Sequence, residues 1–487
     1  MGNYSQRLLE GAETQHLVNF RQGLTTLFLG GNARMNNRKW LKVLLLVLVC
    51  CLCVSLAACQ SKENTNNEAS GTSGKQPSEK TTIKMWTFLD PNGTSAREVA
   101  LKQIITNFER DNPNVKVAVE PQVWDTLGTK FLAANQTGNA PDVIWTSMDD
   151  FGTALKQNAL VDFESLFLNS WTPEDIKDID DAYWAFGNKD GKHYQVTLSR
   201  NYIGILYRED LLAEKGIKVP FKTWDELIDA AVKLTEKDAA TGIQRYGFGQ
   251  AFSPESPDPQ VFPPSLIQSQ GDMFTEGGKA NWSTDAGVTA MNRQLDMVTK
   301  YKVTPDSAIS SSVEDVYNEF KAGRYAMMIG AGVRIPTLQK ESTFDGSKIQ
   351  MTYFPSEDGS TFSPSVINGW NVGVWSGSKN KEAAGKFVEH MINAESDEIW
   401  MTVGGQVPVR KSTVQKNADF LSKPDKTYLS VMAEGFAKYG YAQPWEFPVS
   451  GWRADLNKIA QDILVKGKDV KAALQAAEKE FNERAGS

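Results

Sequence analysis

Apolar residues recur at regular spacings from residue 82 onward, and these spacings predict alternating strands and helices. Strands are predicted at residues 82–86, 115–119 and 141–145, where apolar residues run together or alternate. Helices are predicted between them, at residues 96–111 and 127–134. Ser95 and Glu98 have the spacing of a capping box, and Asn112-Pro113 ends the first of these helices.

The same alternation continues through the rest of the chain. Further strands are predicted at residues 203–206, 325–329 and 372–375, and further helices at 224–234 and 456–464. Thr223 and Glu226 again have the spacing of a capping box. One sheet holding every strand would be overlong, so the pattern predicts an α/β protein of two lobes with mainly parallel strands.

The apolar run at residues 41–54 differs from these elements, because it follows Arg38, Lys39 and Lys42 as the core of a secretory signal does. It ends in Leu56-Ala57-Ala58-Cys59, which resembles the lipobox of bacterial lipoproteins, where the cysteine thiol receives a lipid. The alternative is a transmembrane helix, but a span needs about 20 apolar residues. We therefore expect a signal peptide at residues 35–58 and a lipid on Cys59.

The segments on either side of this signal are polar. Residues 1–34 would place a long extension before the signal, so we interpret them as a start-site artefact, with a cytoplasmic tail as the alternative. Residues 59–80 contain hardly a large apolar side chain and cannot bury enough surface to fold, so they are predicted to form a flexible tether.

Charge and cysteine content narrow the function classes. The chain has 52 Lys and Arg and 59 Asp and Glu; six and two of these precede Cys59, so the mature chain carries 46 minus 57, or −11. An acidic balance argues against nucleic-acid binding. The four cysteines all lie in or beside the signal, so the mature domain is expected to fold without disulfides.

Signatures of catalysis or cofactor binding are not found in the sequence. The mature chain has two histidines, His193 and His390, with no H-E-x-x-H motif, and it has no P-loop or G-x-G-x-x-G motif. We therefore expect neither enzyme activity, nor a metal, nor a cofactor. Carboxylates are plentiful, so a secreted glycoside hydrolase with a carboxylate pair remains the alternative from another class.

Five short motifs occur in the order typical of one known family. They are residues 108–117 together with 138–143, residues 202–210, Gly216 with T-W-D-E-L at 223–227, F-K-A-G-R-Y-A-M at 320–327, and the segment at 377–384 that contains S-K-N-K-E-A-A. Together they resemble the family 1 extracellular solute-binding proteins, the sugar-capturing lipoproteins of ABC importers, which are similar in architecture to maltose-binding protein.

This resemblance implies a type II periplasmic-binding-protein-like fold with a ligand cleft between discontinuous lobes. It places lobe 1 at residues 81–197 with 371–425, lobe 2 at 198–366 with 430–487, and hinge crossings near 195–201, 367–370 and 423–429. It also implies a carbohydrate ligand, an ABC permease as partner and a monomeric protein. The protein would be attached to the outer face of the cell membrane of a Gram-positive bacterium. A sugar sensor for a membrane kinase is a further alternative.

Aromatic residues are candidates for stacking on the apolar face of a sugar. Each tryptophan could equally belong to the core, and position in the chain favours some over others. The candidates are Trp145, Trp370 and Trp452, followed by Trp86 and Trp124.

Polar candidates lie beside these tryptophans or at the expected crossings, where they would bind sugar hydroxyls or an acidic sugar. Asp149 and Asp150 follow Trp145, Asn368 precedes Trp370, and Arg200 lies at the first crossing. Arg334 follows a Gly-Ala-Gly loop where the family often has a tryptophan, and an ion pair is the alternative role for it.

Overall fold

The computed structural model describes residues 80–124, 126–239, 242–254, 261–441 and 451–485. The predicted signal, Cys59 and nearly all of the tether lie outside the described residues. Within them, the predicted strands and helices are confirmed, from the strand at Thr81–Thr87 to the amphipathic helix at Trp452–Lys466. Each helix in this part of the chain is too short or too polar to cross a membrane.

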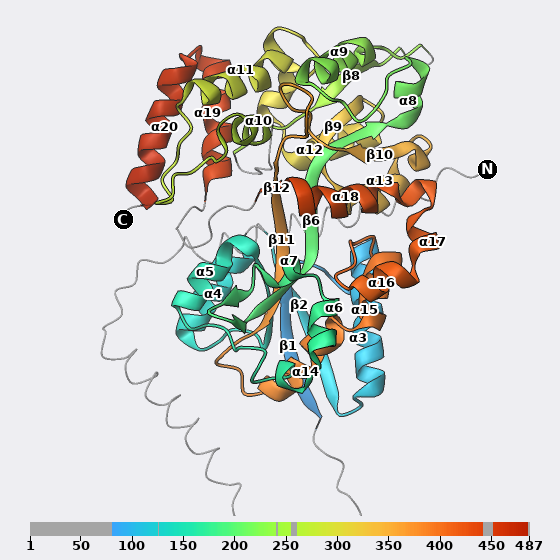
Figure 1. Cartoon of the computed structure of the whole chain (residues 1–487), viewed down its shortest axis with the longest axis vertical. Coiled ribbons are helices and arrows are strands. Elements are labelled where there is room, and N and C mark those ends of the chain that lie inside the picture. The colour runs from blue at the N-terminus through green and yellow to red at the C-terminus, as the bar shows by residue number, and fades with distance from the viewer. Residues whose placement is uncertain (1–79, 125, 240–241, 255–260, 442–450, 486–487) are drawn as a thin grey trace, which may run out of the picture. The chain divides into compact units, whose positions relative to one another are not determined.

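Twelve strands are formed by the described residues (Figure 1). They are β1 (Thr81–Thr87), β2 (Val115–Pro121), β3 (Val143–Ser147), β4 (Asn188–Lys189), β5 (Lys192–His193), β6 (Gln195–Arg208), β7 (Glu236–Lys237), β8 (Gln244–Gly249), β9 (Tyr325–Ala331), β10 (Ile349–Thr352), β11 (Ser365–Val374) and β12 (Gly440–Tyr441).

The α-helices flank these strands. They are α3 (Ala96–Asp111), α4 (Leu127–Thr137), α5 (Phe151–Lys156), α6 (Pro173–Asp178), α7 (Asp181–Trp184), α8 (Glu209–Glu214), α9 (Trp224–Leu234), α10 (Phe262–Gln270), α11 (Asp285–Thr299), α12 (Val313–Lys321), α13 (Ile335–Glu341), α14 (Lys381–Met391), α15 (Ala394–Thr402), α16 (Lys411–Lys416), α17 (Ala418–Leu421), α18 (Thr427–Tyr439), α19 (Trp452–Lys466) and α20 (Val470–Ala485).

Both predicted capping boxes lie at helix starts, but only the first has its predicted return bond. At α3 the Glu98 carboxylate accepts the backbone N–H of Ser95 at 2.9 Å. At α9 the Thr223 hydroxyl accepts the N–H of Glu226 at 3.2 Å, whereas the Glu226 carboxylate accepts from Lys222, one residue earlier than expected. Both helices therefore begin where the sequence predicts.

Strand pairing joins the two halves of the protein into one hydrogen-bonded path, in the order β2-β1-β3-β11-β6-β9-β8-β7. β1 is parallel to β2 and β3, whereas β11 is antiparallel to β3 and to β6. The prediction of mainly parallel strands therefore holds for β1, β2 and β3 but not for the strands around β6 and β11, and one path joins all of them. The physical reason for the single path is the length of β6: residues 195–202 pair with β11, and residues 203–208 pair with β9 and β10.

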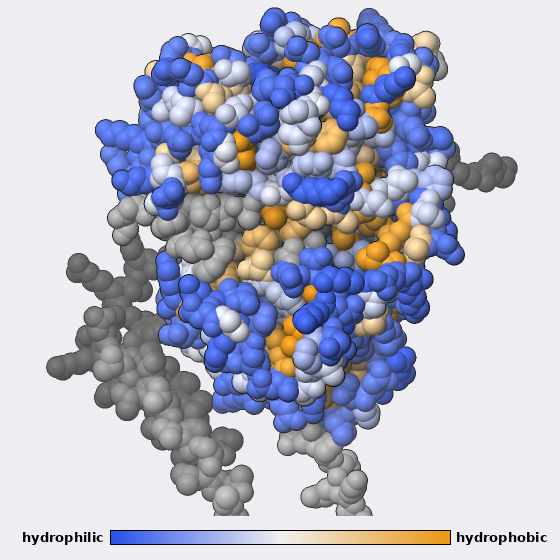
Figure 2. Space-filling view, viewed as in Figure 1, coloured by the Kyte–Doolittle hydropathy of each residue, from blue (hydrophilic) through white to orange (hydrophobic). Residues whose placement is uncertain are grey.

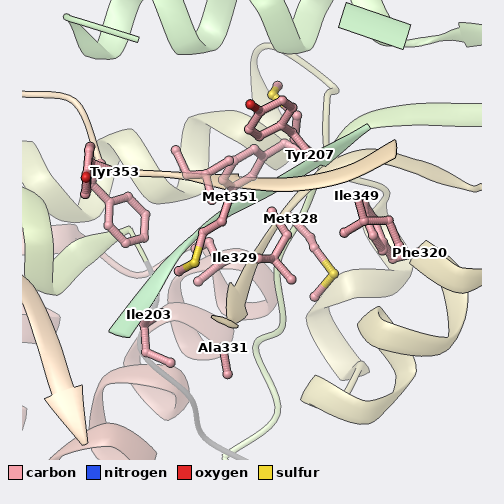
Figure 3. Packing of buried hydrophobic residues seen from close by; sticks show 14 of the residues in the cluster. Ile203, Tyr207, Phe320, Met328, Ile329, Ala331, Ile349, Met351 and Tyr353 are labelled. Atoms are coloured by element: carbon pink, nitrogen blue, oxygen red, sulfur yellow. The ribbon is translucent and has the colours of Figure 1, made fainter. Parts of the chain in front are cut away.

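Three hydrophobic clusters form around this path. The first holds residues from the segments 83–198 and 372–409, around β1, β3 and α3. The second surrounds β6, β9 and β10 and includes Ile203, Met328 and Met351 (Figure 3). The third lies between α10, α11, α19 and α20. Burial of these apolar side chains is the main force that holds each group of elements together.

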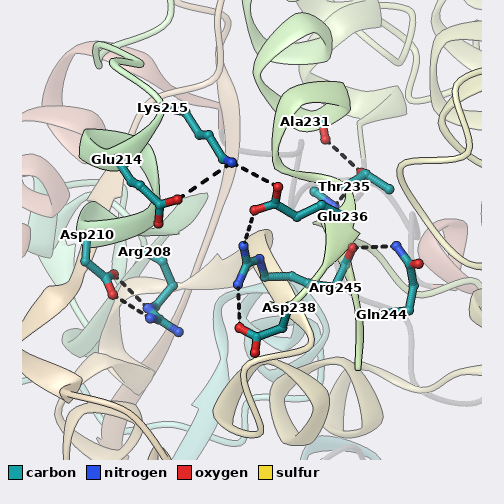
Figure 4. A network of polar contacts seen from close by, with 11 residues as sticks. Arg208, Asp210, Glu214, Lys215, Ala231, Thr235, Glu236, Asp238, Gln244 and Arg245 are labelled. Carbon is teal, nitrogen blue, oxygen red and sulfur yellow. Dashed lines mark hydrogen bonds and ion pairs between the residues drawn. The ribbon is translucent and has the colours of Figure 1, made fainter. Parts of the chain in front are cut away.

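Ion pairs fix the polar side of the second cluster (Figure 4). The buried Arg245 guanidinium donates to Glu236 at 2.6 Å and lies 3.4 Å from Asp238, and Lys215 donates to Glu236 at 2.9 Å. Arg208 is likewise paired with Asp210 at 2.8 Å. A buried cation needs such partners, because an unpaired charge is costly to remove from water.

Candidate ligand-binding site

Aromatic side chains from three neighbouring strands meet near the point where β6 and β11 pass from the first cluster to the second. Phe88 follows β1, Trp145 lies in β3 and Trp370 lies in β11, with Trp370 opposite Ser147 of β3. The Phe88 ring centroid is 4.7 Å from that of Trp370 and 5.8 Å from that of Trp145. These distances are typical of interacting aromatic pairs.

Burial separates the roles of these three rings. Phe88 and Trp370 are half-buried, whereas Trp145 is 1% exposed and packs against Trp400 of α15 at 5.9 Å. The expectation that Trp145 presents an open stacking surface therefore does not hold, because Phe88 covers it. Trp145 supports the surface that Phe88 and Trp370 form. Figure 2 shows pale and orange residues gathered across the middle of one face, between two mostly blue regions.

The backbone of β6 and β11 brings the two predicted crossings side by side. Asn368 lies opposite Asn201, Gly369 opposite Arg200 and Trp370 opposite Ser199, and the register shifts between Trp370 and Asn371. The structure describes the backbone of Asp149, Arg200 and Asn368 but not their side chains. By backbone position, Arg200 and Asn368 adjoin Trp370, and Asp149 follows β3 in the 3-10 turn 148–150.

Buried polar bonds fix the strands beneath the aromatic residues. The Gln195 amide donates to the Thr146 hydroxyl at 2.7 Å, and the Thr197 hydroxyl donates to Asn371 Oδ1 at 2.8 Å. Asn371 Nδ2 donates to the Phe186 carbonyl at 2.8 Å. Since unpaired buried polar groups are costly, these bonds hold one register of β3, β6 and β11 and thereby the position of Trp370.

Asp150 is held inside lobe 1. Its Oδ2 accepts from the Ser147 hydroxyl at 2.8 Å, and the carboxylate lies so close to Gly128 that a Cβ there would be 1.9 Å from Oδ2. Gly128 is in the first turn of α4, where a negative charge is favourable. The carboxylate therefore stabilises the start of α4.

The two remaining candidate tryptophans of lobe 1 differ in exposure. Trp86 is 8% exposed and donates through Nε1 to Glu120 at 2.7 Å, and this hydrogen bond lowers the pKa of the Glu120 carboxyl. Lys130 lies 5.1 Å from the centre of a Trp86 ring. Trp124, in the loop before α4, is 51% exposed beside the exposed Val123. Trp124 is thus the most open of the predicted stacking residues.

Trp452 does not join the other candidates. It begins α19, is 2% exposed and packs edge-on against Phe274 at 6.4 Å in the third hydrophobic cluster. The prediction that Trp452 faces the ligand is therefore wrong, because its side chain is buried in this cluster. A tryptophan at the start of an amphipathic helix can face either a ligand or the core, and the neighbours of Trp452 in the third cluster show that it packs in the core.

Arg334 reaches the same junction from the second lobe. Its guanidinium donates to Glu314 at 2.6 Å and lies 4.6 Å from the centre of the Tyr317 ring. Its charge also acts on Arg97 of α3: burial and the like charge of Arg334 lower the pKa of Arg97 to about 10, although Glu98 and Glu314 oppose this shift. Arg97 and Arg334 therefore face one region from opposite lobes.

Two residues of this region, Phe88 and Arg97, are missed by the sequence reasoning. A signal was present, because Phe88 directly follows β1 and Arg97 lies in the first turn of α3, the next helix, and ligands of α/β proteins bind beyond the carboxyl ends of the strands. No group of three or more His, Cys, Asp or Glu among the described residues is arranged to hold a metal ion. The groups that do converge, aromatic faces and guanidinium donors, are suited to non-covalent binding.

The chain belongs to the bacterial extracellular solute-binding proteins, whose family model matches residues 91–398. A candidate ABC transporter periplasmic-binding protein, YcjN of Escherichia coli (strain K12), is 24% identical over 423 residues, which cover 84% of this chain and 95% of YcjN. The protein is thus a solute-binding member of that family.

Solved structures share its two-lobe type II fold. The ABC substrate-binding protein Lmo0181 of Listeria monocytogenes, in complex with cycloalternan, is 23% identical with a TM-score of 0.69 and covers 84% of this chain and 100% of its own. The GacH receptor of Streptomyces glaucescens, solved unliganded and with acarbose, is 22% identical with a TM-score of 0.70 and covers 84% and 99%. The predicted fold class is confirmed.

Proposed function

We propose that this protein captures a carbohydrate between its lobes and delivers it to the permease of an ABC transporter, without chemistry of its own. The observation that carries the proposal is the half-buried pair Phe88 and Trp370, 4.7 Å apart beside the crossing strands. A pyranose ring has an apolar C–H face that stacks on such rings. The cycloalternan and acarbose complexes of Lmo0181 and GacH support the same ligand class.

The remaining candidates have supporting roles in this proposal. Trp145 backs the aromatic pair, and Trp124 and Trp86 extend the aromatic surface toward the β2–α4 loop. Polar side chains at the crossing strands and nearby bind hydroxyl groups, because hydroxyls need fixed donors and acceptors in a desolvated site. These polar residues are Asp149, Asp150, Arg200, Asn368 and Arg334.

Lobe closure delivers the signal to the permease. β6 and β11 cross from one lobe to the other, with a third crossing proposed at residues 423–429, and rotation about these segments brings the two faces onto the ligand. A ligand that contacts both faces favours the closed form by its differential contacts. The closed protein then presents a surface to the permease that the empty protein lacks.

A lipid on Cys59 holds the protein, acting as a monomer, at the outer face of the membrane of a Gram-positive cell. In this proposal the signal at residues 35–58 is removed, and the tether at 59–80 lets the folded part reach the permease. The polar composition of the tether supports this role, because it cannot form a core.

The binding proposal is tested by titrating the full chain, purified in mild detergent, with a panel of neutral and acidic oligosaccharides. Tryptophan fluorescence and isothermal titration calorimetry should give saturable binding of one ligand per protein. A product assay on the same mixtures separates binding from hydrolysis: steady release of shorter sugars would support the glycoside hydrolase alternative. Binding of no carbohydrate in the panel would refute the proposed function.

A cellular experiment separates transport from sensing. A strain that lacks this gene should lose uptake of the bound sugar and regain it when the gene is restored. Loss of a transcriptional response with unchanged uptake would instead support a sensor for a membrane kinase.

A further inference from the structure

Arg97 is a half-buried cation without an anionic partner. It is the second residue of α3, and its guanidinium carbon lies 5.2 Å from the centre of the Phe88 ring. Among the described residues, no group forms a hydrogen bond or ion pair with it. The adjacent Glu98 carboxylate is occupied, because its two oxygens accept the backbone N–H groups of Asp90 and Ser95.

This arrangement differs from the other buried arginines that the structure describes in detail. Arg245 is paired with Glu236 and Asp238, and Arg208 is paired with Asp210 (Figure 4). Arg410 is paired with Asp178 at 2.9 Å. Those pairs offset the cost of taking a guanidinium out of water. Arg97 has only the face of Phe88, which compensates part of that cost.

A second arginine adds to the positive charge at this place. Arg334 acts on Arg97 from the other lobe, and its own charge is balanced by Glu314. The neighbouring residues Gly404 and Gly405 give independent support for the close approach of the lobes, because one lies against α3 and the other against α13. A Cβ on Gly404 would lie 3.2 Å from the Ala100 side chain of α3, and a Cβ on Gly405 would lie 2.3 Å from the Pro336 side chain of α13.

The local charge balance is therefore positive, in a protein that is negative overall. Arg97, Arg334 and Glu314 sum to one positive charge, and Glu98 is held in the cap of α3. A cation in the first turn of a helix is unfavourable for helix stability as well. An arrangement that costs stability in the empty protein becomes favourable when an anion enters.

We propose that the ligand is an acidic carbohydrate, and that Arg97 binds its carboxylate while Phe88 and Trp370 stack on the sugar ring beside it. The inference rests on the proposed function, since it names the class of sugar for the same site. A guanidinium presents parallel N–H donors that match the two oxygens of a carboxylate. The stacking of Arg97 over Phe88 keeps those donors next to the aromatic surface.

The test compares uronic-acid oligosaccharides with the same oligosaccharides after reduction of each carboxyl group to an alcohol. The full chain in mild detergent is titrated with both sets by calorimetry, at low and at high salt. The acidic member should bind about 10- to 100-fold more tightly than its reduced counterpart. This preference should shrink at high salt, because screening weakens charge–charge attraction.

Two variants assign the preference to one side chain. Arg97→Gln should remove the preference for the acidic sugar, because it should weaken the binding of the acidic sugar about 10- to 100-fold more than that of the reduced sugar. Arg97→Lys should retain part of the preference, because it keeps the charge without the paired donors. The matched control is Arg110→Gln in the last turn of the same helix, where Arg110 pairs with the adjacent Asp111.

The outcomes separate this inference from the proposed function. If the reduced sugars bind as tightly as the acidic ones, or if Arg97→Gln weakens both sets equally, the inference is overturned while carbohydrate binding stands. If the wild-type protein binds neither set nor any neutral sugar, the proposed function fails and the inference with it. Circular dichroism of each variant checks that a lost preference does not come from unfolding.

Discussion

Replacing Trp145 and Trp370 separately should distinguish the support of the aromatic site from its surface. Trp145 is 1% exposed, and truncating a fully buried tryptophan to alanine typically costs about 3–5 kcal/mol of unfolding free energy. Trp370 is half-buried and loses mainly its contact with Phe88, so Trp370→Ala should cost about 0.5–1.5 kcal/mol of stability. In ligand affinity the order should reverse, with Trp370→Ala weakening binding by about 1–3 kcal/mol, or roughly 5- to 150-fold.

Urea unfolding of the ligand-free protein, followed by circular dichroism, measures the free energy of unfolding of each variant. Calorimetric titration with the sugar found by screening measures the ligand affinity. Trp145→Phe is the matched control, because it keeps an aromatic ring and removes an Nε1–H that has no acceptor among the described residues. It should therefore cost less than Trp145→Ala. Stability of Trp145→Ala equal to that of the wild type, or a large stability loss in Trp370→Ala with unchanged affinity, would refute the assigned roles.

Three further predictions address the anchor, the lobes and the fold. Cys59→Ala should release the protein from membranes with unchanged sugar affinity, because Cys59 precedes the first strand, which begins at Thr81. A variant retained on membranes after high-salt washing would contradict the lipid anchor. Spin labels on Thr94→Cys and Ser310→Cys should show a shorter, narrower distance distribution with saturating sugar, and an unchanged distribution argues against closure. Asp178→Asn should lower the free energy of unfolding by about 1–3 kcal/mol, because Asp178 binds the buried Arg410. The control Asp190→Asn, at an exposed turn, should change the free energy of unfolding by less than about 0.5 kcal/mol. Equal effects of the two substitutions would contradict a stabilising role for the Asp178–Arg410 pair.

Local elements could be predicted because their signals lie within a few residues. The apolar face at residues 101–108 and the Ser95–Glu98 spacing predicted α3, which ends at Asp111, directly before Asn112-Pro113. The half-formed box at Thr223 and Glu226 shows the limit of such signals. The Glu226 carboxylate could accept from the backbone N–H of Thr223 or from that of Lys222, and in the structure it accepts from Lys222. Local geometry decides between two such neighbouring donors, and the spacing of residues in the sequence does not determine that geometry.

The candidate site was predicted only in part. Residues at the crossings, such as Trp370 and Arg200, could be proposed because the resemblance to the family places crossings there. Trp452 was assigned to the ligand although it packs in a hydrophobic cluster, since a tryptophan at a helix start has the same sequence signal in both roles. Phe88 was missed because a single aromatic residue after a strand is a weak pattern.

The sequence by itself determined the negative net charge of the chain and most helices and strands, since each depends on composition or on neighbours along the chain. Only the tertiary structure decided that β6 joins both lobes, that Phe88 covers Trp145 beside Trp370, and that Arg97 approaches Arg334. These contacts join residues more than 50 positions apart. Their formation depends on how all the elements pack at once, and no local pattern encodes that packing.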